Sequence, residues 1–343
     1  MLELEIVILA NNCVFPFQDF SQDKRLNFVK LNKLFATHAL AEHGLGFLLN
    51  LYEINDRFNG IEKSLIYKAI FDMGSNNLSF LYNAQLMGYQ LHNVNSIVIS
   101  HWHYDHIGAL LKILEQVENK IFIFCHENAK LIRVFKRSKD ISNGDLLGKT
   151  IKEIKPFIEK GKLVIQDAIN VNGLEKLNAM VKFMKNDFEL FKNDSIRILV
   201  SGEIPRKHDV EDFDSFYAFK EEILQIDKIL DDKFLIIELE NQAILLNGCC
   251  HSGLMNSLDH ATSLTNKPIR IIIGGFHMAS VSEKRMKLTI SYLRDYSANH
   301  GLLYLFPIHC SGEIFLNRIR NLNDENIISN NISVCTTFKF SIK

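Results

Sequence analysis

The sequence has 343 residues, of which 47% are hydrophobic, and 39 basic residues balance 40 acidic ones. A chain of this size and composition buries a substantial core and forms one large or two ordinary domains. A formal net charge of −1 gives no overall field to attract nucleic acid or an anionic membrane, so any anion binding must be local. The first residues lack the basic segment of a signal peptide, and six scattered cysteines are typical of free thiols. We therefore expect a cytoplasmic globular protein.

Short apolar segments alternate with segments of helical periodicity along the chain, which indicates an α/β fold. The expected strands are residues 4–9, 47–52, 65–71, 96–99, 121–124, 196–200, 234–240, 243–246, 271–273, 302–306 and 332–335. The expected helices are residues 77–87, 107–118, 127–137, 213–230, 253–264, 283–296 and 313–321. Residues 130–194 are rich in Lys and Asn and lack this alternation. We interpret them as an insertion that either covers the functional site or is a peripheral addition.

The strand expected at residues 96–99 leads into a dense group of metal-binding side chains, namely His101, His103, Asp105 and His106. Alternate residues of an extended segment point the same way, so the first two histidines can bind one ion. The apolar spacing that follows predicts a helix, which directs Asp105 and His106 to a neighbouring point. Imidazoles and a carboxylate suit zinc, or iron and manganese where more oxygen ligands join. The group predicts a binuclear metal site, against the alternative of a His-rich surface turn.

Three later histidines follow apolar strands, at junctions where α/β folds place active sites: His251, His277 and His309. Asp72 is typical of a turn and can also accept a hydrogen bond from a ligand imidazole. Arg206 offers a fork of donors to a phosphate or carboxylate, with a surface salt bridge as the equal alternative. The other histidines, including His43, have no such context, and we expect them to be structural or exposed.

A two-metal site needs only two of the three late histidines as ligands. His251 and His309 each lie between a strand and a Ser-Gly helix start, which would hold a ligand rigidly. His277 follows two glycines and precedes a looser segment, which suits contact with a substrate. We therefore predict His251 and His309 as metal ligands and His277 as a catalytic residue.

Residues 101–106, after the Asp-Met-Gly of residues 72–74, resemble the His-x-His-x-Asp-His signature of the metallo-β-lactamase superfamily. Further segments are similar to its branch of 7,8-dihydropterin-6-methyl-4-(β-D-ribofuranosyl)aminobenzene 5′-phosphate synthase: Asn11 and residues 42–46, 202–206, 248–253, 274–277 and 309–312. The resemblance implies a four-layer αββα sandwich with the metals at one edge. It also implies a single domain over residues 1–343, with residues 130–194 inserted.

The resemblance also implies a ligand set: His101, His103 and His251 for a first metal, and Asp105, His106 and His309 for a second. The bridging Asp of many members corresponds here to Gly248-Cys249, so either Cys249 or Cys250 ligates, or a water bridges unaided. The expected metals are two divalent transition ions, with zinc first and iron or manganese as alternatives.

The implied activity is that of a metal-dependent hydrolase of a small anionic, phosphorylated substrate, with a metal-bridging hydroxide as nucleophile. Asp105 would also accept a proton, and Arg206 would hold the anion. One alternative is the condensation that gives the branch its name, because family membership alone does not determine the substrate. Another is a non-catalytic metal-binding sensor or interaction protein, against which the intact ligand set argues. We expect no nucleic-acid or membrane partner.

Overall fold

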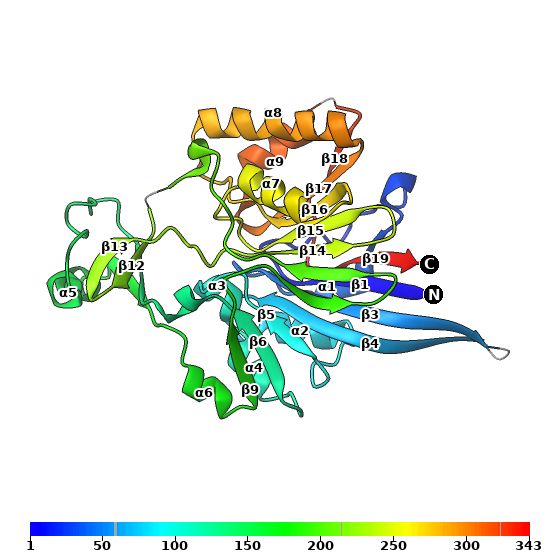
Figure 1. The fold of residues 1–343 in the computed structure, drawn as a ribbon, viewed down its shortest axis with the longest axis horizontal. Helices are drawn as coiled ribbons and strands as arrows, with labels where there is room; N and C mark the ends of the chain where they lie inside the picture. Colours follow the sequence, from blue (N-terminus) through cyan, green and yellow to red (C-terminus); the bar gives the residue numbers. More distant parts are fainter. Residues whose placement is uncertain (58–59, 214, 323) are drawn as a thin grey trace.

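The computed structural model describes residues 1–57, 60–213, 215–322 and 324–343. Within these ranges the strands form two large sheets and one small sheet, with helices on the outer sides of the large sheets (Figure 1). The layers run helix, sheet, sheet, helix, so the four-layer αββα sandwich expected from the sequence is confirmed.

The first large sheet combines an antiparallel and a parallel part. Its strand order is β2 (Val29–Leu31), β19 (Thr336–Ile342), β1 (Leu2–Ala10), β3 (Gly46–Arg57), β4 (Gly60–Met73), β5 (Ser96–Val98), β6 (Ile121–Cys125) and β9 (Ala179–Phe183). Strands β4, β5, β6 and β9 run parallel, and such strands are covered on both faces. The outer cover is an apolar cluster that includes residues of α2 (Ser79–Leu86), α4 (Leu110–Leu114) and α6 (Val171–Glu175).

The second large sheet places four strand ends at one edge. Its order is β10 (Phe188–Lys192), β11 (Arg197–Val200), β14 (Phe234–Glu238), β15 (Ala243–Asn247), β16 (Ile269–Gly275), β17 (Leu303–Ile308) and β18 (Ile327–Ser329). Strands β15 to β18 are parallel and are connected through α7 (Leu254–Leu264), α8 (Glu283–His300) and α9 (Glu313–Arg320). The carboxyl ends of β15, β16 and β17 therefore meet, and the loops that leave them are neighbours.

The main core lies between the two large sheets. Phe47 and Phe71 stack there with ring centroids 6.2 Å apart, and Ile237 and Ile273 of the opposite sheet belong to the same cluster. Burying apolar side chains stabilises the fold by about 1.5–3 kcal/mol for each large residue. This layer fixes how the loops of one sheet meet those of the other.

A small sheet projects from the sandwich, on the left of Figure 1. Its order is β13 (Ile223–Ile226), β12 (Tyr217–Lys220), β7 (Arg133–Lys136) and β8 (Leu163–Gln166), and α5 (Ile151–Glu159) packs on it. We call residues 133–166 and 217–226 the small lobe. Residues 130–194 supply β7, α5 and β8 to this lobe, but α6, β9 and β10 to the large sheets.

Three predicted elements were wrong. Residues 127–137 form a 3₁₀ turn, Glu127–Lys130, followed by β7, and residues 213–230 contain the hairpin of β12 and β13. The hairpin turns at Glu221 and Glu222, which have φ angles of 51° and 68°; because these residues are not typical of turns, the apolar spacing around them suggested a helix. Residues 332–335 form a turn before β19. The remaining short elements are 3₁₀ turns Lys24–Leu26 and Asp209–Glu211, and α1 (Lys33–His38).

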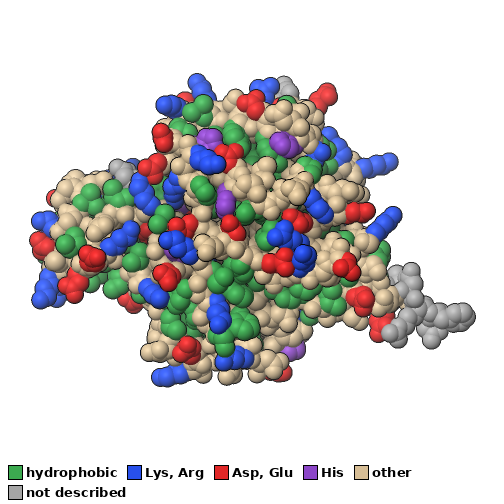
Figure 2. All heavy atoms as spheres, in the orientation of Figure 1, with side chains coloured by type: hydrophobic (Ala, Val, Ile, Leu, Met, Phe, Trp, Pro, Cys, Tyr) green, Lys and Arg blue, Asp and Glu red, His purple; other side chains and the backbone are tan. Residues whose placement is uncertain are grey.

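The surface carries both signs of charge. Figure 2 shows basic and acidic side chains interspersed over the face that it presents, in keeping with the formal net charge of −1. In the described part of the chain, helices of membrane-spanning length and apolarity are absent.

Candidate metal centre

The predicted ligands come from four neighbouring loops at one edge of the sandwich. Residues 101–106 follow β5 and lead into the short α3 (Tyr104–Ile107), while Cys249 and His251 follow β15. His277 follows β16, and His309 begins the 3₁₀ turn η4 (His309–Ser311) directly after β17. The parallel strands thus bring together side chains that are far apart in the sequence.

Imidazoles of the first predicted ligand set converge. His101 Nε2 lies 3.0 Å from His103 Nδ1 and 3.2 Å from His251 Nε2. Burial, with a smaller contribution from neighbouring histidines, lowers the pKa of His101 and of His251 well below the usual value. Burial also lowers the pKa of His103 to about 3. All three rings are therefore neutral at pH 7, which is the state that binds a metal. We call these three residues the first subsite.

A carboxylate and two imidazoles converge beside them. Asp105 Oδ2 lies 3.3 Å from His309 Nε2 and 3.9 Å from His106 Nε2. Burial would raise the pKa of Asp105, but the imidazoles of His106 and His309 outweigh it and hold that pKa far below the usual value. His309 Nε2 is buried and has no hydrogen-bond partner. We call Asp105, His106 and His309 the second subsite.

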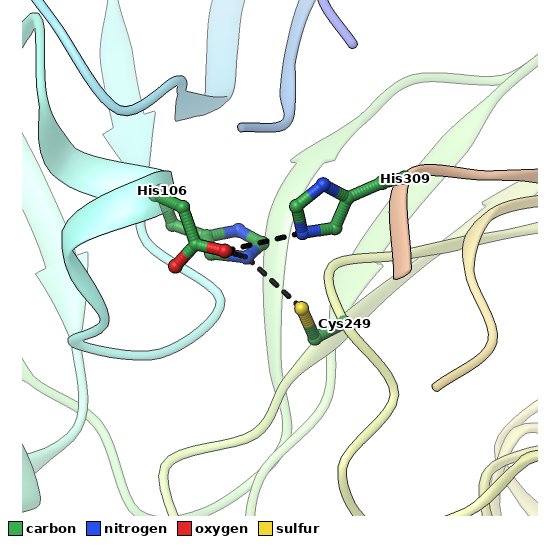
Figure 3. A group of neighbouring side chains, drawn as sticks. His106, Cys249 and His309 are labelled. Atoms are coloured by element: carbon green, nitrogen blue, oxygen red, sulfur yellow. Dashed lines mark hydrogen bonds and ion pairs between the residues drawn. The ribbon is translucent and has the colours of Figure 1, made fainter. Parts of the chain in front are cut away.

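Cys249 lies between the two subsites. Its Sγ is 3.1 Å from His106 Nε2, and Figure 3 shows His106, Cys249 and His309 converging from separate segments. Ligand atoms of Cys249, His101 and His251 lie within 4.8 Å of one another, and Cys249 forms a second such group with the whole second subsite. Cys250 Sγ instead lies 3.4 Å from Ser257 Oγ of α7. Of the two cysteines that the sequence left open, Cys249 therefore has the position of a bridging ligand.

Asp72 orients a histidine of each subsite. His106 Nδ1 donates to Asp72 Oδ2 over 2.7 Å, and Ser100 Oγ donates to the same oxygen over 2.6 Å. Ser100 Oγ also lies 2.9 Å from His101 Nδ1. Burial opposes protonation of His106, but Asp72 and Asp105 raise its pKa to about 9. With Nδ1 carrying a proton, each ring presents Nε2 to the site, as carboxylate-supported metal ligands do.

Two asparagines hold His309 in place. The backbone N–H of His309 donates to Asn11 Oδ1 over 3.1 Å, and His309 Nδ1 lies 3.1 Å from Asn12 Oδ1. The residue has a φ of 54°, an unfavourable conformation for a side chain other than glycine. The strain is kept because these contacts direct Nε2 toward Asp105.

His43 is the candidate residue that the sequence reasoning missed. Its Nε2 lies 3.5 Å from Asp105 Oδ2, and its ring stacks on that of His309 with centroids 5.0 Å apart. The side chain is 57% exposed, so it can contact both solvent and the site. Its loop follows no apolar strand, and the Glu-His-Gly segment was the one signal in the sequence.

A buried arginine connects the small lobe to the metal-binding loop. Arg133 is 1% exposed, and its guanidinium donates to Asp227, Asp231 and the carbonyl of Trp102 over 2.7, 2.6 and 2.7 Å. Asp231 also accepts from the N–H of Trp102 over 2.8 Å. Because Trp102 lies between His101 and His103, this network fixes the backbone of the first subsite.

Aromatic side chains from the lobe side cover the first subsite. Phe135 of β7 and Phe216 lie against His103, with ring centroids 5.2 and 5.5 Å away. Phe216 also contacts His251, with centroids 5.0 Å apart. This apolar cover limits the access of water to the first subsite.

The structure places the other two predicted catalytic residues on either side of the His251 loop. The ring of His277 is 4.3 Å from that of His251, and its Nδ1 is buried without a hydrogen-bond partner. Arg206 Nη1 donates to the carbonyl of His251 over 3.4 Å, and Nη2 donates to the carbonyl of Lys228. The guanidinium of Arg206 thus already donates to two backbone carbonyls, and an anion would compete with them for its N–H groups.

The donor set fits a pair of transition metals. Imidazoles, one carboxylate and one thiol present their ligand atoms to one another in a buried site, where His309 Nε2 has an ion-pair contact with Asp105 but no hydrogen bond. Such unpaired buried donors and acceptors are costly unless they bind something. The hydrogen bonds of Asp72 and Asn12 complete the support that metal ligands usually have.

Known proteins are similar to this chain in sequence. Residues 68–171 match the sequence model of the metallo-beta-lactamase superfamily. An uncharacterized protein of Methanocaldococcus jannaschii is 25% identical over 83% of this chain and 90% of its own. The 7,8-dihydropterin-6-methyl-4-(beta-D-ribofuranosyl)-aminobenzene-5′-phosphate synthase of the same organism is 24% identical over 79% of this chain and 82% of its own.

A solved structure shares the whole fold. The crystal structure of Tm1679, a metal-dependent hydrolase of the beta-lactamase superfamily, is 17% identical in sequence, with a TM-score of 0.63 over 99% of both chains. The matched segment contains the His-x-His-x-Asp-His block itself, and the fold extends beyond it to β17 and η4, which carry His309, the last predicted ligand. Over residues 68–171 the chain is thus similar to the metallo-β-lactamase superfamily, and over its full length it shares the fold of Tm1679.

Proposed function

We propose that the protein is a binuclear metallohydrolase of a small anionic, phosphorylated substrate. The observation that carries the proposal is the position of Cys249 Sγ, which lies within 4.8 Å of ligand atoms of both subsites. One shared ligand between two donor groups is typical of paired ions about 3.5–4 Å apart. Such a pair, when bound, supplies an activated water as nucleophile and neutralises charge on a phosphoryl group.

The side chains around the pair have separate tasks in this proposal. Asp105 would hold a metal, and it is ionised at neutral pH, which is the state that can accept a proton during attack. His43, 3.5 Å from Asp105 Oδ2 and half exposed, passes that proton to solvent. His277 contacts the substrate from beside His251, where its ring lies 4.3 Å away. Phe135 and Phe216 exclude bulk water from the first subsite.

The test combines elemental analysis with turnover on generic phosphomonoesters and phosphodiesters. We expect about two transition-metal ions per chain, and loss of both metal and turnover on chelation. His106→Ala should lose metal and activity, whereas His277→Ala should keep the metals and lose turnover. His92→Ala, at an exposed position, serves as the matched control. A protein that takes up no transition metal on titration would refute the proposal.

A second candidate is the condensation reaction named by one relative, the synthase that is 24% identical over 79% of this chain. Supplying an activated dihydropterin together with a ribofuranosylaminobenzene 5′-phosphate distinguishes the two. A coupled product would favour the synthase, and phosphate release alone would favour the hydrolase. Full metal loading with no turnover of either kind would instead favour the non-catalytic metal-binding class.

A further inference from the structure

A third group of metal-binding side chains lies beside the two subsites. Cys249, His277 and Cys310 each bring a ligand atom within 4.8 Å of the others. Cys310 follows the ligand His309, and its Sγ lies 3.3 Å from the carbonyl oxygen of Cys249. The two subsites already described use neither Cys310 nor the ring nitrogens of His277.

The backbone is arranged to bring these three side chains together. A Cβ at residue 275 would lie 2.7 Å from Cys310 Sγ and 2.6 Å from the carbonyl oxygen of Gly248, so only glycine lets the two loops approach this closely. His277 has a φ of 45°, a strained conformation for a non-glycine residue. Strain of this kind is found where a side chain must be held for function.

One donor atom of this group lacks a partner. His277 Nδ1 is buried and accepts or donates no hydrogen bond. An unsatisfied buried nitrogen is unfavourable, and binding a metal ion would remove the penalty. The ring of His251 lies nearby, with centroids 4.3 Å apart, and makes no hydrogen bond to this nitrogen.

We propose that Cys249, His277 and Cys310 form a third metal position, which binds a thiophilic divalent ion such as Zn²⁺ or Cd²⁺. Two sulfurs and one imidazole are a softer ligand set than the imidazoles and carboxylate of the two subsites, and soft sets select such ions. Binding displaces the protons of the two thiols to solvent, and one sulfur, that of Cys249, is shared with the metal pair. The fourth position is left to water.

The third ion inhibits the enzyme. This consequence rests on the proposed function, in which Cys249 bridges the pair and His277 contacts the substrate. A third ion would compete for the sulfur of Cys249 and would occupy the ring of His277. The third position shares Cys249 with the metal pair. It therefore fills after the pair and binds an ion only when metal is in excess.

The test is a Cd²⁺ titration of chelator-treated protein, followed by elemental analysis and by sulfur-to-cadmium charge-transfer absorption. We expect about three ions per chain in the wild type and about two in Cys310→Ser, with about half the charge-transfer intensity, since one thiolate remains. His277→Gln should also bind about two ions while keeping both thiolates. Cys13→Ser, at a partly exposed cysteine outside the group, is the matched control and should bind three.

The outcomes separate this proposal from the proposed function. Two ions in the wild type, with a spectrum unchanged in Cys310→Ser, would refute the third position and leave the metal pair intact. No uptake of ions at all would refute the pair and the third position together. As a second measurement, excess Zn²⁺ should inhibit the wild type and not Cys310→Ser; equal inhibition of both would contradict the inhibitory role.

Discussion

Replacing Arg133 with methionine should destabilise the protein and weaken its metal site together. Arg133, Asp227 and Asp231 are each 1% exposed, and the guanidinium is the cation that pairs with both carboxylates. Removing one partner of a buried ion pair leaves uncompensated charge and costs about 3–5 kcal/mol. We therefore expect Arg133→Met to lower the free energy of unfolding by about this amount, which is a large share of the stability of a typical domain.

Arg133→Met should also lower the metal affinity, through its effect on the backbone of Trp102. Arg133 Nη1 donates to the carbonyl of Trp102, and Asp231, which Arg133 holds, accepts from the N–H of Trp102. In the variant, the backbone between His101 and His103 therefore loses this support. Loss of contacts that orient metal ligands typically costs about 10–100-fold in metal affinity. We therefore expect this buried ion pair between the lobe and residues 101–106 to couple stability to metal binding.

Denaturant unfolding of the metal-free protein and competition with a chelator measure the two effects separately. Arg137→Met, at an exposed position directly after β7, is the control and should change stability by less than about 0.5 kcal/mol. Burial opposes ionisation of Asp231, but the Arg133 charge outweighs it and lowers the pKa of Asp231. The wild type therefore gains stability from this group above the ordinary carboxyl pKa, and the difference between wild type and variant should shrink as the pH falls. Equal free energies of unfolding for Arg133→Met and the control Arg137→Met would refute the reasoning.

Three further predictions follow from contacts at or near the site. Cys249→Ser should lower metal content and turnover because the shared ligand is lost, whereas Cys250→Ser should leave both unchanged; the reverse result would move the bridge to Cys250. Arg206→Ala should weaken metal binding at the first subsite, because Arg206 supports the His251 carbonyl; unchanged metal content with a raised KM for phosphorylated substrates would restore its anion-binding role. Burial lowers the pKa of Lys233 to about 8, so the unfolded chain holds more protons between pH 8 and the ordinary lysine value, and stability rises with pH over that range. Lys233→Met should flatten that rise in denaturant titrations, and an unaltered pH profile would contradict the burial effect.

The parts of the fold that the sequence predicted are those whose signals are local. Central strands such as β1 and β15 are covered on both faces, and residues 6–10 of β1 and 243–246 of β15 are unbroken apolar segments. The predicted ligand block is equally local, because residues 101–106 carry four donors in the loop after β5 and at the start of α3. The late histidines were singled out for a related reason, since each lies in the loop that follows an apolar strand.

The parts that were missed depend on contacts between distant segments. The hairpin of β12 and β13 pairs with β7, which lies in another part of the chain, and its turn at residues 221–222 has no glycine or asparagine. Arg133 is one basic residue in a Lys-rich stretch, and its burial follows from Asp227 and Asp231. His43 owes its place to Asn12 and His309, which reach it from either end of the sequence.

The choice between Cys249 and Cys250 shows why long-range contacts decide the site. Cys249 and Cys250 are adjacent and of the same residue type, so the sequence does not distinguish them. Their different roles must come from the residues around each one. A Cβ at Gly248 would lie 2.2 Å from Ser100 Oγ and 3.1 Å from Asp72 Oδ2, so glycine lets this loop press against the groups that orient the ligand histidines. From there Cys249 points to His106, while Cys250, with a φ of 64°, turns toward α7. One close approach of two loops therefore fixes both the orientation of His106 and which of the two cysteines lies between the subsites.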